Sequence, residues 1–188
     1  MVSSYFKNLK KAVIDNSKGK TWNEAVNEWE ITGWNEDSEC NSQCTCGKEG
    51  LRYLYTIFNP ITENTLFPIG SCCIKRFGRQ ELNEKIETLE GMFKLYYAIR
   101  NNERIELSSK YFSKKLLLAL YKDNAFPPNK YNHNDGKNDY QFMLEMFNKR
   151  DKLAITDNQR KKINAIIAWS IRPYLKQKLN FNTTGVIK

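Results

Sequence analysis

All five cysteines of the chain lie in one stretch, at Cys40, Cys44, Cys46, Cys72 and Cys73. Reduced cysteines that pack as small apolar groups would be scattered along the sequence, whereas the first three of these share a short polar loop. A disulfide framework is disfavoured by the odd count and by the lack of a signal peptide. Zinc takes four thiolate or imidazole ligands in a tetrahedron, and structural sites are closed by four protein groups. The cysteine pattern therefore predicts a structural zinc site.

Three successive elements are expected to position these cysteines. A Cys-x-Cys-Gly turn at residues 44–47 presents two sulfurs, with the glycine taking a backbone conformation that other residues resist. The apolar stretch that follows is broken at Asn59-Pro60, which predicts a β-hairpin with strands at 51–59 and 65–69. The hairpin returns the chain to a helix that starts near Ser71, so that a cysteine in its first turn can close the site. This order predicts a treble-clef-like zinc unit.

The fourth ligand must come from the adjacent pair Cys72 and Cys73, since neighbouring side chains point in different directions and are not expected to bind one ion together. We assign Cys73 as the ligand on the helix, with Cys40, Cys44 and Cys46 as the other three. Cys72 is the alternative to Cys73.

The stretch CTCGKEGLRYLYTIFNPITENTLFPIGSCCIKRF, residues 44–77, resembles a motif of small phage and mobile-element proteins of low-GC Gram-positive bacteria. The motif combines a Cys-x-Cys-Gly knuckle, a Tyr-rich strand, an Asn-x-x-Thr turn and a Gly-Ser-x-Cys-Ile element. Its matching positions here are Asn59, Thr62, Gly70, Ser71, Cys73 and Ile74, and Ala25 and Trp29 match a lead-in that often precedes it. This resemblance supports Cys73 over Cys72.

Zinc-binding anti-CRISPR proteins that inhibit the Cas9 effector are members of that group, and this chain looks like one of them. The resemblance implies a protein that binds a Cas9-type effector, alone or with its guide RNA, and blocks its targeting of DNA. It also implies that zinc is structural. The motif is specific for the zinc unit and not for the partner.

The overall composition indicates a globular protein with anionic partners. Lys and Arg number 30 against 21 Asp and Glu, which gives a formal net charge of +9. Such an excess favours nucleic acid or an acidic protein surface, although a lysine-rich solvated surface is the plain alternative. The longest apolar runs are too short to cross a membrane. We therefore expect the protein in the reducing cytoplasm of a host bacterium.

The chain is expected to be of the α+β class, with two parts. Residues 1–78 carry N-terminal helices and the zinc-binding hairpin, and residues 79–188 form a helical part of about four to five helices packed against it. Capping-box patterns begin at Thr21 and Thr156. Ser108 or Ser109 is expected to cap a helix, and the last long helix is expected to run through Ile163 to Trp169.

Catalytic chemistry has little support in the sequence. The chain has one histidine, and four thiolates on zinc would leave no open position for water. We therefore expect a non-enzymatic protein that binds an effector or, alternatively, binds nucleic acid directly. The expected partner-binding residues are cationic side chains of the helical part: Lys114, Lys115, Lys149, Arg150, Arg160, Lys161 and Lys162.

Overall fold

The computed structural model describes residues 3–180, and within them the chain divides into two compact units. The first ends at Ile86 and the second begins at Glu87, so the division falls inside helix α4 (Gln80–Arg100). We call residues 3–86 the sheet unit and residues 87–180 the helical unit. A domain boundary at residues 78 and 79, and the packing of the two parts against each other, stay predictions, and residues 181–188 lie outside the described range.

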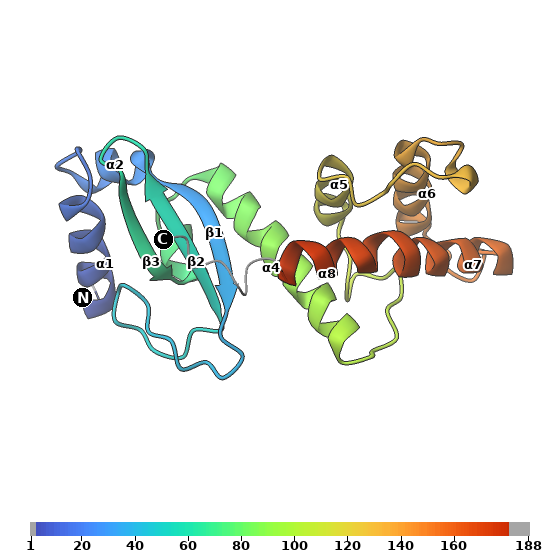
Figure 1. Ribbon diagram of the computed structural model, residues 1–188, viewed down its shortest axis with the longest axis horizontal. Helices are drawn as coiled ribbons and strands as arrows, with labels where there is room; N and C mark the ends of the chain where they lie inside the picture. The colour runs from blue at the N-terminus through green and yellow to red at the C-terminus, as the bar shows by residue number, and fades with distance from the viewer. Residues whose placement is uncertain (1–2, 181–188) are drawn as a thin grey trace. The chain divides into compact units, whose positions relative to one another are not determined.

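The sheet unit is built on three antiparallel strands, with β2 between the other two (Figure 1). They are β1 (Glu30–Glu36), β2 (Tyr53–Asn59) and β3 (Asn64–Ile69). The turn between β2 and β3 is held by Asn59, whose Oδ1 accepts hydrogen bonds from the amides of Ile61 at 2.9 Å and Thr62 at 3.3 Å. An asparagine side chain that bonds the backbone in this way favours a turn. The predicted hairpin is confirmed.

Short helices flank this sheet in the sequence: α1 (Ser4–Asp15), α2 (Trp22–Ala25), the 3-10 helix η1 (Val26–Glu28) and α3 (Ser71–Lys75). Thr21 and Glu24 form the predicted capping box at the start of α2. The core beside them contains Trp29, which is fully buried and whose Nε1 donates a hydrogen bond to Ser17 Oγ at 2.9 Å. A buried indole normally needs such a partner for its N–H.

Every regular element of the helical unit, within the described residues, is a helix. After α4 come α5 (Lys114–Lys122), the 3-10 helix η2 (Lys130–Asn132), α6 (Gly136–Asn148), α7 (Asp157–Ile166), the π-helix η3 (Ile167–Ile171) and α8 (Arg172–Asn180). Their apolar faces form a core that includes Phe93, Leu117, Met143, Ile166 and Leu175. Thr156 and Gln159 form the predicted capping box of α7.

The π-helix η3 lies just before Pro173. Proline has no amide hydrogen and its ring clashes with the carbonyl four residues earlier, which here belongs to Trp169. A wider π turn moves that carbonyl away from the ring, so the proline fits without ending the helical path.

The chain thus has a mixed α+β fold, as the sequence predicts. The treble-clef arrangement of the zinc unit stays a prediction. Among the described residues, no helix has both the length and the apolar character needed to span a membrane.

Candidate metal centre

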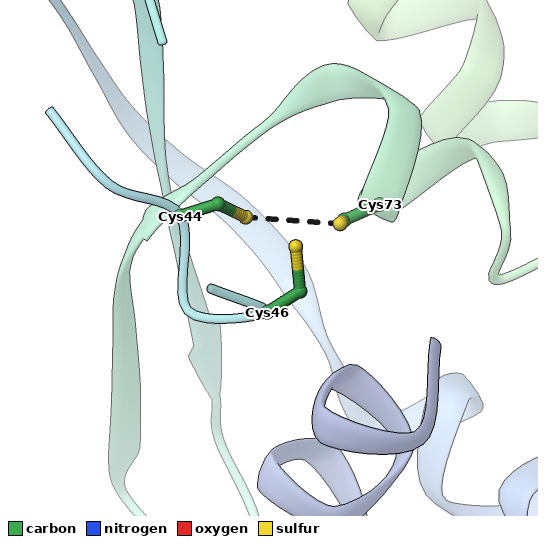
Figure 2. Close-up of side chains that lie close together, drawn as sticks. All are labelled: Cys44, Cys46 and Cys73. Atoms are coloured by element: carbon green, nitrogen blue, oxygen red, sulfur yellow. Dashed lines mark hydrogen bonds between the residues drawn. The ribbon is translucent and has the colours of Figure 1, made fainter. Parts of the chain in front are cut away.

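Three of the predicted ligands come together in the sheet unit. The Sγ atoms of Cys44, Cys46 and Cys73 all lie within 4.8 Å of one another. Figure 2 shows the three sulfurs pointing toward a common centre, with Cys44 and Cys73 joined across it at 3.7 Å. The side chains are 4%, 2% and 9% exposed, respectively. These three thiols could hold a metal ion.

A tight loop presents Cys44 and Cys46. The amide of Cys44 donates to the carbonyl of Lys48 at 2.8 Å, and the amide of Gly47 donates back to the carbonyl of Cys44 at 2.7 Å. Gly47 has φ +92, a conformation that residues with a Cβ rarely adopt. The loop is fixed to β3 through Thr45, whose amide and hydroxyl both donate to the Pro68 carbonyl. The Cys-x-Cys-Gly turn thus adopts the conformation expected from its glycine.

The third thiol comes from helix α3, which follows β3 directly. The amides of Cys73 and Ile74 donate to the carbonyl of Gly70, so the first turn carries Cys73 toward the loop. Its neighbour Cys72 is exposed and is not part of the cluster. The structure therefore distinguishes the two adjacent cysteines and places Cys73, not Cys72, in the cluster.

Backbone amides and neighbouring thiols favour negative charge on Cys44. The contact with Cys73 lowers the pKa of the Cys44 thiol, and the amides of Cys46 and of Gly70, the latter at 3.3 Å, act in the same direction. The Cys44 sulfur, together with burial, raises the pKa of Cys73. Sulfurs this close repel one another when more than one is ionised, unless a cation lies between them. The cluster thus favours one thiolate, at Cys44, and a bound cation would allow the other thiols to ionise as well.

Cys40, the fourth predicted ligand, is not part of the cluster. It has φ 58 and lies in a turn that Asp37 closes, since the Asp37 carboxylate accepts from the amide and hydroxyl of Ser42, both at 2.7 Å. The Ser42 hydroxyl, with backbone amides, lowers the pKa of Asp37. The turn holds Cys40 apart from the other three, and its role as a ligand stays a prediction.

The predicted cationic residues all belong to the helical unit, on separate elements. Lys114 and Lys115 begin α5, Lys149 and Arg150 follow α6, and Arg160, Lys161 and Lys162 lie on α7. Four of them make contacts within the chain: Lys115 with Glu87, Lys149 with the Ala154 carbonyl, Arg160 with the Lys152 carbonyl and Lys162 with Asp139. The structure brings Lys161 and Lys162 together on the wall of one groove.

The sequence analysis missed that groove, which is also lined by Tyr131 and Trp169. A signal was present in the sequence. Lys162, Ala165, Ile166 and Trp169 follow the i, i+3, i+4, i+7 spacing of one helix face, and that face combines a lysine with a tryptophan.

Fold and site together define an α+β protein with a buried three-thiol cluster. Comparisons with family models, with curated proteins and with solved structures found no match to this chain.

Proposed function

We propose that Cys44, Cys46 and Cys73 hold a structural zinc ion. One observation supports this above all, the distance of 3.7 Å between the Cys44 and Cys73 sulfurs. A tetrahedral ion with Zn–S bonds of about 2.3 Å places its sulfurs about 3.8 Å apart. Cys44 and Cys73 already have that spacing, and all three sulfurs lie within 4.8 Å of one another. The amides directed at Cys44 supply the outer hydrogen bonds that metal ligands usually have.

Bound zinc would link three segments that are far apart in the sequence. Cys44 and Cys46 belong to the loop before β2, and Cys73 belongs to α3 after the hairpin. Asn8 of α1 contacts the same loop, because its Nδ2 donates to the Cys46 carbonyl at 3.1 Å. The ion would supply binding free energy that stabilises this whole arrangement.

The zinc proposal is tested by metal content. The purified chain should contain one equivalent of zinc, and Cys73→Ser should contain much less than one. Cys72→Ser is the matched control, because it changes the adjacent but exposed cysteine and should retain the full equivalent. Equal zinc content in the two variants would overturn the assignment.

The fourth ligand decides whether the site is closed. With Cys40 bound, four thiolates would leave no position for water, which was the argument against a catalytic zinc. Substitution with cobalt tests this, since its absorption bands differ between four sulfur ligands and three. If Cys40 binds, Cys40→Ser should change the spectrum of the cobalt form. An unchanged spectrum would show that the fourth ligand is not Cys40.

We further propose that the protein is a non-enzymatic inhibitor that binds a Cas9-type effector and blocks its DNA targeting. The support is the sequence resemblance of residues 44–77 together with the formal net charge of +9. The zinc centre would act as a scaffold, and cationic side chains would contact the effector, its guide RNA or both. Such an effector offers both anionic RNA and protein surface.

The test is a pull-down with purified Cas9, with and without guide RNA, paired with a target-DNA binding assay. Capture of the effector with loss of target binding is expected. Salt-sensitive binding to free nucleic acid, without capture of the effector, would favour the alternative of a nucleic-acid-binding protein of a mobile element. If the chain binds neither the effector nor free nucleic acid, the inhibitor proposal is overturned and only the zinc proposal stands.

A further inference from the structure

The helical unit contains an open groove of about 850 Å³ between η2, the start of α6 and the α7–η3 segment. Pro127, Tyr131, Asp139, Lys161, Lys162 and Trp169 are among the residues that line it. A groove of this size is in the range of ligand sites. It is independent of the zinc centre, which belongs to the sheet unit.

Two large aromatic rings of this groove face solvent. Trp169 is 81% exposed and Tyr131 is 76% exposed, although most large apolar side chains of the unit are buried. Trp169 lies in the π-helix η3, and π turns are frequent at functional sites. Single exposed aromatic residues are common on surfaces, but two on one groove indicate a binding surface.

The charge at the groove is positive. Its acidic residue, Asp139, is 3% exposed, accepts a hydrogen bond from Asn132 at 2.8 Å and pairs with Lys162 at 3.7 Å. Lys161 is exposed on the same wall, and Lys130 places its Nζ 4.9 Å from the centre of the Tyr131 ring. The charge accessible to a ligand is therefore cationic.

The charge of the whole chain is concentrated in the same unit. Residues 87–180 have 18 Lys and Arg against 10 Asp and Glu, a formal net charge of +8. Residues 1–86 have 11 of each and are formally neutral. A second copy of this chain would bring the same positive charge to the groove, so a polyanion is the better complement.

We propose that this groove binds single-stranded nucleic acid, with unpaired bases stacked on Trp169 and Tyr131 and phosphates contacted by Lys161 and Lys162. Aromatic platforms beside a cationic groove are the common means of binding single strands, because every base has a face that can stack. Recognition of this kind tolerates many sequences. The groove proposal adds a nucleic-acid contact to the proposed inhibitor function, and it does not depend on that function.

Fluorescence anisotropy of the full zinc-loaded chain with labelled oligo-dT and oligo-U tests the proposal. Both oligonucleotides should bind, and their two affinities compare DNA with RNA directly. Trp169→Ala and Tyr131→Ala should each weaken binding by about 5- to 100-fold, the usual loss for one stacked base. Leu153→Ala is the matched control, because Leu153 is 89% exposed in the same unit but does not line the groove.

Tryptophan fluorescence gives a second readout that a general loss of structure would not mimic. Trp169 is the one tryptophan of residues 87–180, and its exposed ring should be quenched when a base stacks on it. Trp169→Phe should retain much of the affinity, since a smaller ring can still stack. Quenching that persists in Trp169→Ala would overturn the proposal.

Salt dependence tests the lysine contacts. Each phosphate contact contributes about 0.7 to the slope of log affinity against log salt for single strands. Lys161→Gln should therefore lower the slope by about 0.7, and Lys176→Gln, an exposed lysine on α8 outside the groove, should lower it less.

Absence of binding to both oligonucleotides would overturn the proposal, as would equal affinities of Trp169→Ala and the parent chain. If Trp169→Ala instead abolished binding to RNA-free effector protein, the groove would be a protein-binding surface. Zinc content and effector capture are measured separately, so a failure here is distinguishable from a failure of the proposed function.

Discussion

The two units use the same residue types in opposite ways. In the sheet unit Trp29 is fully buried with its N–H paired to Ser17, and in the helical unit Trp169 is 81% exposed. All five cysteines belong to the sheet unit, and no comparable cluster of His, Cys, Asp and Glu lies in the described part of the helical unit. The positive charge is concentrated in the other unit: the formal net charge is +8 for residues 87–180 and zero for residues 1–86.

This contrast indicates a division of labour. The sheet unit contains the three-thiol cluster, and a metal bound there would stabilise that unit, because metal-binding free energy is also folding free energy. The helical unit has its own apolar core and can leave aromatic and cationic side chains on the surface. If this is correct, changes in one unit should affect stability and changes at the groove of the other should affect binding.

If the cluster holds zinc as proposed, removal of the ion should have the largest effect, and only in the sheet unit. Cys46→Ser, or treatment with a chelator, should cost that unit ~3 kcal/mol or more, because the binding free energy of structural zinc is also folding free energy. Hydrogen exchange resolved by peptide measures this: protection should fall in strands β1 to β3 and persist in α5 and α6. Equal loss of protection in both units would contradict the division.

The paired tryptophan variants should differ by several kcal/mol. Trp29→Ala removes a fully buried side chain and should destabilise the fold by about 3–5 kcal/mol. Trp169→Ala removes an exposed ring and should change stability by about 0.5 kcal/mol or less. Denaturant unfolding compares the two directly. A large cost for Trp169→Ala would show that the ring packs in the fold and would weaken its assignment to binding.

The stability of the helical unit should fall when a side-chain atom is added where two backbone segments lie close together. A Cβ on Gly136 would lie 1.9 Å from the Phe126 carbonyl oxygen, so Gly136→Ala should cost about 1–3 kcal/mol. Gly91→Ala is the control, because its Cβ would meet only the tip of the Leu116 side chain, at 3.2 Å, and alanine favours helix. Thermal unfolding should separate the variants, and similar melting temperatures would contradict this account of the contact.

Local signals in the sequence predicted much of the sheet unit and one helix start of the helical unit. The hairpin follows from the apolar strands and the Asn59 turn, and the Cys-x-Cys-Gly loop follows from the freedom of Gly47. The capping boxes at Thr21 and Thr156 were also predicted and are confirmed. Each of these features is decided by residues within a few positions of one another, which is why spacing alone reveals them.

Features that depend on which side-chain hydrogen bonds form, or on which helix face the fold covers, were not predicted. Cys40 lies in a turn closed by the Asp37 carboxylate, which cysteine spacing does not reveal. The expectation of a cap at Ser108 or Ser109 is wrong, because Ser113 caps α5 and the buried Tyr111 and Phe112 precede it.

Trp169 was expected to continue the apolar spacing of α7. The buried side chains of this segment are Ile163, Ile166, Ile167, Ser170 and Ile171. Trp169 lies off their face and lines the groove with Lys162 and Ala165.

Acid should weaken the sheet unit through Glu28, the smallest effect expected here. Partial burial opposes a charge on this carboxylate, but hydrogen bonds from Asn59 at 2.7 Å and from the amides of Gly19 at 2.7 Å and Lys18 at 2.9 Å outweigh it. The pKa of Glu28 therefore lies below its ordinary value of 4.5. A lowered pKa in the folded state means that the ionised form stabilises the fold.

That stabilisation should be complete above about pH 4.5 and decline as the pH falls through the lowered pKa of Glu28. Glu28→Gln should lower stability at pH 7 and flatten the acid limb of the stability curve, so that the variant and the parent converge at low pH. Urea unfolding from pH 3 to 7 measures both curves. Parallel curves would mean that the carboxylate charge does not stabilise the loop at residues 18–19, and that packing alone holds it against the β2–β3 turn.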